Sequence, residues 1–250
     1  MSGDFVVDVI KFNAQTAGRD KVCRLIQYGS KFLWYRLQQS HTHEELLQKL
    51  KSLESAVSNT RKLLRFGKSF DFFHGALKTL HLSDVVLRLT LTLSKINQAC
   101  YLLIDHLVWM GRVGLVHIDM KKWLDVSARF WLVSIMLNLV RDVYDIIKVL
   151  TEAIQSRKAM LRRSQYNNGD TQYKDKEKKV LTNIDLVVRC VSENKPLMLD
   201  FLKNGADFFL PMSSLGHIQT SAGTQGILGV VSSVIGVLTV WNPLLRLVPS

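Results

Sequence analysis

His81, Ser83 and Asp84 carry the side-chain types of a hydrolase triad, in which a histidine activates a serine nucleophile and a carboxylate orients the histidine. Residues this close in one chain cannot readily adopt that geometry, and the sequence contains no Gly-x-Ser-x-Gly nucleophile elbow. Ser83 suits the N-cap of a helix, with Asp84 near the helix start and paired with Arg88 four residues later. The motif therefore predicts a helix boundary, not acyl-transfer chemistry.

A second pair, Asp105 and His106, has groups that could relay protons inside a membrane, although such a pair more commonly faces the interior of a bundle. The cysteines form neither a Cys-x-x-Cys pair nor a metal-ligand cluster, and they indicate reduced thiols in a protein that faces the cytosol. They are Cys23, Cys100 and Cys190. We expect no enzymatic activity, no cofactor and no metal site.

An amphipathic segment over residues 61–82 is the most informative part of the chain. Large apolar side chains recur there at spacings of three and four, which places one face of a helix at Leu63, Phe66, Phe70, Phe73, Leu77 and Leu80. Its only acid is Asp71, and the opposite side and flanks carry Arg61, Lys62, Arg65, Lys68 and Lys78. An aromatic face backed by cations is typical of a helix in the headgroup layer of an anionic membrane, so we expect both sets to bind lipid.

The charge balance favours a polyanionic partner. The 250 residues include 33 Lys and Arg against 21 Asp and Glu, a formal net charge of +12. Such an excess is typical of proteins that bind nucleic acid or an acidic lipid surface. The chain starts with Asp4 and Asp8 where a secretory signal would have a basic and then an apolar run, so we expect no secretion.

The elements that position these residues are predicted to be helices. Proline is absent from the first 195 residues, and the apolar residues repeat with a helical period. We therefore predict an all-α fold, a membrane-associated helical bundle with amphipathic helices and a C-terminal transmembrane helix. The expected helices before that one cover residues 18–38, 44–82, 85–110, 121–151, 180–192 and 197–210.

Two of these predicted helices contain residues that could interrupt them. Glycine weakens a helix interior, so Gly67 or Gly75 is the expected break within residues 44–82. Residues 85–110 are long enough to span a bilayer, but polar and charged side chains interrupt them at Arg88, Lys95, Asp105 and His106. We expect this hydrophobic helix to be buried in a membrane-associated bundle or to dip into one leaflet, and a full crossing is the alternative.

Composition divides the chain into three parts. Residues 1–154 hold the amphipathic and hydrophobic helices, residues 155–179 are polar and charged and indicate a linker, and residues 180–250 form a C-terminal region. Residues 222–242 lack charge and are long enough to cross the hydrocarbon layer, although a buried glycine-rich hairpin in a soluble core is the alternative. Small residues line one face of this helix, where they would let two copies pack closely, at Ala222, Gly226, Gly229, Ser233 and Gly236.

The chain resembles the peroxin-11 family of peroxisomal membrane proteins. No single motif carries the resemblance, but an ordered set of segments does, collinear over nearly the whole chain. The segments are Asn13-Ala-Gln-Thr-Ala-Gly-Arg-Asp20, Arg61-Lys-Leu-Leu-Arg-Phe-Gly67, His81-Leu-Ser-Asp-Val-Val-Leu-Arg88, Leu107-Val-Trp-Met-Gly111, Leu137-Asn-Leu-Val-Arg-Asp-Val-Tyr144 and Gly226-Ile-Leu-Gly-Val-Val-Ser-Ser233. The chain looks most similar to the alpha and beta vertebrate-type members.

The resemblance implies elongation, proliferation and fission of peroxisomes, through insertion of the amphipathic helix, membrane curvature and homo-oligomerisation. It implies an integral protein of the peroxisomal membrane with both termini in the cytosol. It also implies hetero-oligomers with family paralogues, delivery by the peroxin-19 receptor, and recruitment of fission adaptors and a dynamin-related GTPase. Some relatives end in a basic tail proposed to bind coat proteins, whereas this chain ends Leu247-Val-Pro-Ser250.

Two other functions fit parts of the sequence. A pore for small metabolites would use Arg88, Lys95, Asp105 and His106 to line a polar path between helices. A soluble adaptor for nucleic acid would use the net charge of +12 but would leave the C-terminal span unexplained. We therefore expect an anionic phospholipid membrane as the partner and no nucleic acid.

Overall fold

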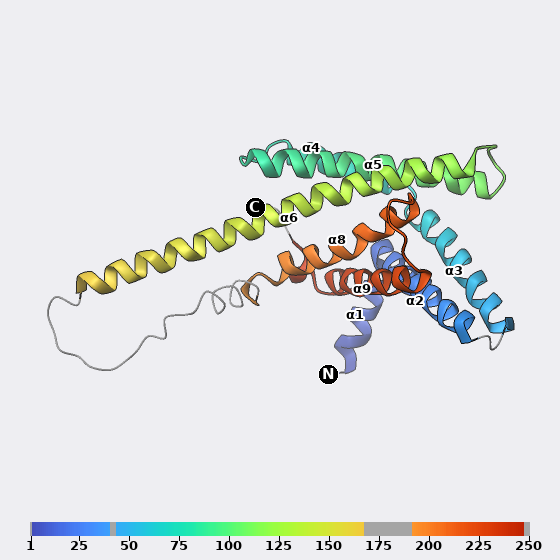
Figure 1. The fold of residues 1–250 in the computed structure, drawn as a ribbon, viewed down its shortest axis with the longest axis horizontal. Coiled ribbons are helices and arrows are strands. Elements are labelled where there is room, and N and C mark those ends of the chain that lie inside the picture. The colour runs from blue at the N-terminus through green and yellow to red at the C-terminus, as the bar shows by residue number, and fades with distance from the viewer. Residues whose placement is uncertain (1, 41–43, 168–191, 248–250) are drawn as a thin grey trace.

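The computed structural model describes residues 2–40, 44–167 and 192–247, and these residues form helices without any strand (Figure 1). The elements are α1 (Ser2–Ala14), α2 (Thr16–Ser40), α3 (Glu44–Leu64), α4 (Lys68–Thr79), α5 (Val85–Arg112), α6 (Met120–Asn167), α8 (Lys195–Ser214), α9 (Ala222–Trp241) and the short 3-10 helix η1 (Pro243–Leu245). The all-α prediction is confirmed. The short helix expected over residues 180–192 lies outside the described residues except for its last position.

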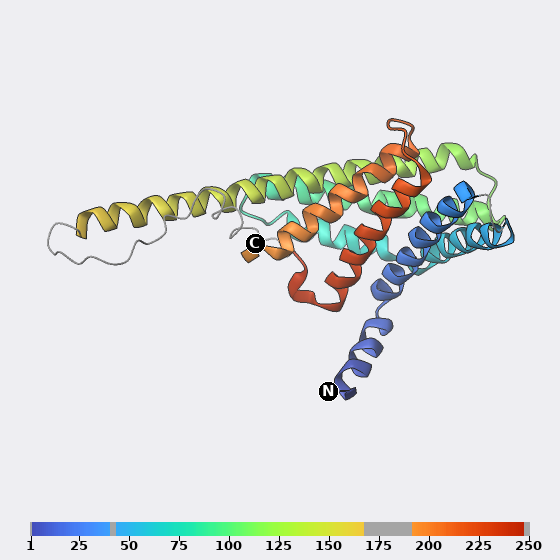
Figure 2. The same ribbon diagram turned by 60° about the horizontal axis from the view of Figure 1, so that its bottom comes forward.

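The helices pack as two groups that share one long helix. In the first group α2 lies between α3 and α9, and α8 packs on α9. In the second group α4 and α6 both pack on α5, and α6 also contacts α8 and so joins the groups (Figures 1 and 2). Since an α-helix rises about 1.5 Å per residue, the 48 residues of α6 extend roughly 30 Å beyond the length of the 28-residue α5.

Gly67 separates α3 from α4. Its backbone has φ +77°, a left-handed conformation that glycine adopts without the steric cost other residues incur. Gly75, the other candidate break, lies within α4, where the carbonyl oxygen of this residue accepts a hydrogen bond from Lys95 Nζ at 3.0 Å. The amphipathic segment is therefore divided between two helices, with Leu63 in the last turn of α3 and Phe70, Phe73 and Leu77 on α4.

The structure corrects two local predictions. Helix α6 continues to Asn167, although the composition indicates a linker from residue 155. Residues 155–163 contain no glycine or proline and several good helix formers, so their polarity alone does not end the helix. The N-cap of α5 is Asp84 and not Ser83, because the Asp84 carboxylate accepts hydrogen bonds from the backbone N–H groups of Val86 and Leu87 at 2.9 and 3.3 Å.

The small-residue face of α9 packs on α2 of the same chain. A Cβ atom on Gly226 would lie 2.8 Å from the backbone nitrogen of Phe32, and a Cβ atom on Gly229 would overlap the ring of Tyr28. Glycine therefore allows the two backbones to come close, as expected for packing in a membrane. A second copy could reach these glycines only by displacing α2, so the contact between copies predicted at Ala222, Gly226, Gly229, Ser233 and Gly236 is occupied within the monomer.

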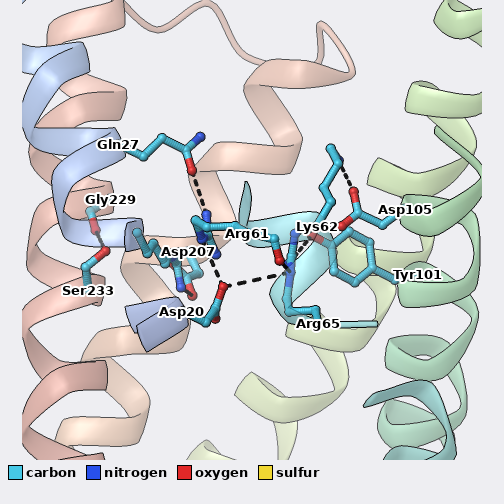
Figure 3. Close-up of polar contacts among 11 residues, drawn as sticks. Asp20, Gln27, Arg61, Lys62, Arg65, Tyr101, Asp105, Asp207, Gly229 and Ser233 are labelled. Carbon is cyan, nitrogen blue, oxygen red and sulfur yellow. Dashed lines mark hydrogen bonds and ion pairs between the residues drawn. The ribbon is translucent and has the colours of Figure 1, made fainter. Parts of the chain in front are cut away.

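The interior between the helices contains buried ion pairs beside its apolar core. Asp20 of α2 pairs with Arg61 Nε at 3.0 Å and with Arg65 Nε at 3.9 Å, and Arg61 also donates to Gln27 (Figure 3). Asp105 of α5 pairs with Lys62 and with Arg65 Nη2, the latter at 2.6 Å. We call these five charged residues the Asp20–Asp105 cluster; it joins α2, α3 and α5.

Two further buried ion pairs connect the C-terminal helices to the rest. Arg24 of α2 forms a bidentate pair with Asp207 of α8, and burial of both ions makes this a costly contact to break. A second group lies between α6 and α8. There Arg141 contacts Asp142 and Asp200, and Asn204 donates to Asp142 at 2.7 Å.

The close approach of α2 and α9 predicts the effect of Gly226→Ala. The added methyl group meets the backbone of Phe32, so the helices must separate, and overpacking of this kind costs about 1–3 kcal/mol. We expect a lower midpoint in thermal unfolding of the full chain in lipid nanodiscs. Gly205→Ala in α8 is the matched control. Its Cβ atom meets nothing within 4 Å, so this variant should be as stable as the wild type or more stable.

The Asp20–Asp105 cluster predicts the effect of Asp105→Asn. The substitution leaves Lys62, which is only 7% exposed, and Arg65 without the carboxylate they share. Breaking a buried pair from one side costs about 3–5 kcal/mol, so the unfolding midpoint in nanodiscs should fall sharply. Asp8→Asn is the control, because the Asp8 side chain is 54% exposed and its contact with Lys11 is 3.9 Å long. Equal midpoints for the two variants would contradict a stabilising role for the cluster.

Candidate membrane-binding site

The end of α3 and the outer face of α4 present a continuous apolar surface. All six apolar residues predicted to bind lipid are exposed, and Phe70, Phe66 and Leu77 are 73%, 67% and 61% accessible. We call this the α4 apolar face, formed by Leu63, Phe66, Phe70, Phe73, Leu77 and Leu80. Exposed large apolar patches mark a binding site for a protein or a membrane.

The inner face of α4 is built from small and polar side chains. Ser69, Ala76 and Thr79 are buried against α5, and the hydroxyls of Thr79 and Thr92 lie 2.9 Å apart. The helix thus places small polar groups inside and large aromatic groups outside, the reverse of a helix in a water-soluble core. The arrangement is typical of a helix whose outer face contacts hydrocarbon.

Three of the five cations predicted on the polar side of residues 61–82 lie in the interior of the protein, where a helical wheel predicts a surface facing solvent or headgroups. Arg61 and Lys62 are buried, and the Arg65 side chain is 12% exposed, because all three belong to the Asp20–Asp105 cluster. These three cations therefore pair with aspartates inside the protein. The structure does not place them at a lipid surface, as the sequence had predicted. Lys78 is exposed and Lys68 is half-buried at the start of α4.

The aspartate partners of these cations were not predicted from the sequence. Asp20 and Asp105 lie about forty residues from Arg61 and Arg65 in either direction, and nothing in a helical wheel of residues 61–82 refers to them. The available signal was Asp105, the one acid within the hydrophobic helix expected over residues 85–110. A charge in such a helix requires a partner, and the nearest amphipathic helix supplies it.

The polar residues of α5 are tied to α3 and α4. His106 packs on the ring of Phe66 with centroids 5.0 Å apart, and its Nε2 lies 3.1 Å from the carbonyl oxygen of Arg65. Tyr101 accepts a hydrogen bond from Arg65 at 3.0 Å. With Asp105 in the cluster and Lys95 bound to the Gly75 carbonyl, three of the four residues proposed to line a pore have partners between helices. The fourth, Arg88, is half-buried.

Apolar exposure continues beyond α4. The outer faces of α5, α6 and α9 carry exposed large side chains, among them Leu89, Leu93, Ile96, Val133, Met136, Val140, Ile227, Val231 and Val234. Within the described residues one helix, α9, is long and apolar enough to cross a membrane. The C-terminal span is thereby confirmed in length and composition, and the α4 apolar face lies in a molecule with other lipid-compatible surfaces.

Comparison with known proteins finds one family model and several relatives that match nearly the whole chain. Residues 6–241 match the family model "Peroxisomal biogenesis factor 11 (PEX11)". The human protein named peroxisomal membrane protein 11B is 35% identical over 258 residues, covering 96% of this chain and 98% of the relative. Human peroxisomal membrane protein 11A is 33% identical, with 95% and 97% covered.

A more distant relative extends the comparison. Peroxisomal membrane protein PMP30B of Candida boidinii is 27% identical over 246 residues, covering 95% of this chain and 94% of the relative. No solved structure matches the chain. Because the family model and both human relatives cover nearly the entire sequence, the chain belongs to the peroxisomal biogenesis factor 11 (PEX11) family.

Proposed function

We propose that this protein elongates and proliferates peroxisomes and prepares them for fission, by inserting the α4 apolar face into the cytosolic leaflet of the peroxisomal membrane. The observation that carries the proposal is the exposure of all six residues of that face in an otherwise packed helix. Burying one Phe or Leu side chain contributes about 1.5–3 kcal/mol, so six of them favour insertion strongly even after ordering costs.

The shape of α4 suits a wedge. Its 12 residues span about 18 Å, too short to cross the hydrocarbon layer, so the helix lies along the surface with its aromatic side chains pointing inward to the acyl chains. Volume added to one leaflet only favours curvature. Lys78, and Lys68 at the start of α4, remain as the cations that can meet anionic headgroups, each near-surface charge contributing about 1 kcal/mol.

The remaining parts of the proposal concern assembly. The protein is an integral protein of the peroxisomal membrane, anchored through α9, with its N-terminus in the cytosol. A C-terminus in the cytosol as well requires an even number of crossings, of which residues 85–110 would be the first. It forms homo-oligomers and hetero-oligomers with its paralogues, is delivered by the peroxin-19 receptor, and recruits fission adaptors and a dynamin-related GTPase. Because α2 covers the small-residue face of α9, the oligomer contact is proposed on another surface.

The wedge predicts that Phe70→Glu with Phe73→Glu abolishes membrane deformation. The two charges cannot enter hydrocarbon, and the apolar contribution of two aromatic rings is lost, roughly 3–6 kcal/mol in total. The full-length variant, reconstituted into anionic proteoliposomes, should leave the vesicles round in electron micrographs, whereas the wild type should form tubules. In cells the variant should reach peroxisomes without elongating them.

The matched control is Ser52→Glu with Ser55→Glu. Both residues are exposed on α3, so the variant carries the same two added charges and leaves the α4 apolar face intact. Tubules from this control and none from the aromatic variant would support the wedge. Tubules from both variants would contradict it.

A further inference from the structure

One side of α2 is apolar over most of its length. Between Arg19 and Arg36, a stretch that the structure describes without a gap, the exposed residues are Val22, Ile26 and Leu33. The two arginines that bound this side are themselves exposed, and they lie about 26 Å apart along the helix at 1.5 Å per residue. The hydrocarbon core of a bilayer is about 30 Å thick, so the apolar side of α2 has nearly the length of a membrane crossing.

Helix α8 repeats this pattern. Between Lys195 and Ser214, which are both exposed, the exposed residues of this fully described helix are Leu202 and Phe209. The two bounds lie about 28 Å apart along the helix. We call the exposed apolar sides of α2 and α8 the apolar belt, together with the adjoining exposed residues of α9, which are Ile227, Val231, Val234 and Leu238.

The charged residues of both helices point into the bundle. Arg24 of α2 and Asp207 of α8 form the bidentate pair, with side chains that are each 8% exposed. Asp200 of α8 pairs with Arg141 of α6. Ionisable side chains at membrane depth face the interior of a bundle and pair with one another. The charges of α2 and α8 are therefore compatible with hydrocarbon on the outer side of both helices.

Helix α2 lies beside α9 over almost the whole length of the predicted span. Four glycines of α9 face α2, and the residues that they face run in reverse order: Gly223 faces Tyr35, Gly226 faces Phe32, Gly229 faces Tyr28 and Gly236 faces Lys21. The two helices are therefore antiparallel. Because their backbones are in close contact from one end to the other, α2 lies at the same depth in the membrane as α9.

Contacts at both ends of the belt agree with this placement. At the end of α2, the ammonium of Lys51 lies 4.8 Å over the ring of Trp34, and within α3, all of which is described, no charged residue after Lys51 is exposed. At the end of α9, the ring of Trp241 lies 6.0 Å from that of Phe5 and 5.5 Å from that of Phe12 in α1. Tryptophan is enriched at the level of the headgroups, so this contact marks the second edge of the belt.

We propose that α2 and α8 cross the hydrocarbon layer beside α9, with the apolar belt in contact with acyl chains. The belt continues the outer surface of the one described helix that is long and apolar enough to span a membrane, and its length matches the bilayer. Composition does not identify α2 and α8 as spans, because their charged residues count against them even though these residues pair inside the bundle.

The proposal goes beyond the single anchor of the proposed function, and it rests on α9 being a span. Ser213, at the end of α8, accepts a hydrogen bond from Gln225 near the start of α9 at 2.7 Å, so α8 also runs antiparallel to α9 (Figure 2). Both α2 and α8 then begin on the side of the membrane where α9 ends, and the turn over residues 215–221 lies on the other side. The chain between α2 and α8 crosses an odd number of times, the total is even, and α2 is a crossing before residues 85–110.

The test measures the depth of single spin labels on the full chain in nanodiscs, with Cys23, Cys100 and Cys190 replaced by alanine. Electron paramagnetic resonance compares accessibility to oxygen, which concentrates in hydrocarbon, with accessibility to a water-soluble nickel chelate. Val231→Cys on α9 is the reference, and labels at Ile26→Cys and Phe209→Cys should lie within about one helical turn, 5.4 Å, of its depth. Lys49→Cys is the aqueous control, because this side chain is 68% exposed on α3.

The possible outcomes separate the proposal from the anchor. Nickel accessibility at Ile26→Cys or Phe209→Cys equal to that of the aqueous control, with the reference label in hydrocarbon, would overturn the proposal and leave the anchor through α9. A reference label in water would overturn both.

A second measurement uses isolated peroxisomes and a maleimide that does not cross membranes. Lys195→Cys and His217→Cys, both at exposed positions at opposite ends of α8, should differ, one reacting at once and the other only after the membrane is permeabilised. Equal reaction of the two in intact peroxisomes would place both ends of α8 on one side and contradict a crossing.

Discussion

The Asp20–Asp105 cluster is the interaction on which the arrangement of the molecule depends. Helix α3 ends between two aspartates that come from different helix groups. Arg61 and Lys62 of α3, and Arg65 directly after it, pair with these aspartates. Direct packing between α3 and α5 is sparse, so the ion pairs supply much of the contact there. In a low-dielectric interior such pairs add little net stability over apolar packing, but a wrong arrangement would strand a buried charge. The cluster therefore acts mainly by excluding other arrangements of α2, α3 and α5.

Fixing the end of α3 in this way decides what α4 presents to its surroundings. The chain must turn immediately after Arg65 to place α4 along α5, and Gly67 provides the left-handed residue for that turn. Because Ser69, Ala76 and Thr79 form the buried face, the large side chains of α4 can only point outward. The apolar face and the interior ion pairs are thus two results of one constraint, which is why the same short segment carries both aromatic and cationic residues.

The sequence predicted what depends on local periodicity. The helices over residues 18–38, 85–110 and 222–242, the break at one of two glycines, and one apolar side of residues 61–82 all follow from the spacing of side chains along a single helix. The partners of Arg61, Lys62 and Arg65 could not be predicted in this way, because they lie about forty residues distant and a helical wheel does not distinguish solvent from a neighbouring helix. The same limit applies to α9, where small residues predicted close packing but not that Phe32 and Tyr28 of α2 would occupy it.

The connections also explain how a short surface helix could act on a membrane through a distant anchor. Helix α9 is held to α2 by close backbone contact at Gly226, α2 is held to α3 by Asp20, and α3 passes through Gly67 into α4. The first two steps are tight packing and a buried ion pair, neither of which deforms gradually, and packing of α4 on α5 fixes α4 beyond the turn at Gly67. A helix that rotates freely about a loose linker would insert without fixing the orientation of the rest of the protein in the membrane. Helix α4, in contrast, is held at a defined angle to α9. In the proposed wedge, force exerted by the leaflet on the aromatic side chains would therefore be transmitted to α9, and the orientation of the whole bundle, as well as the inserted volume, would determine the curvature.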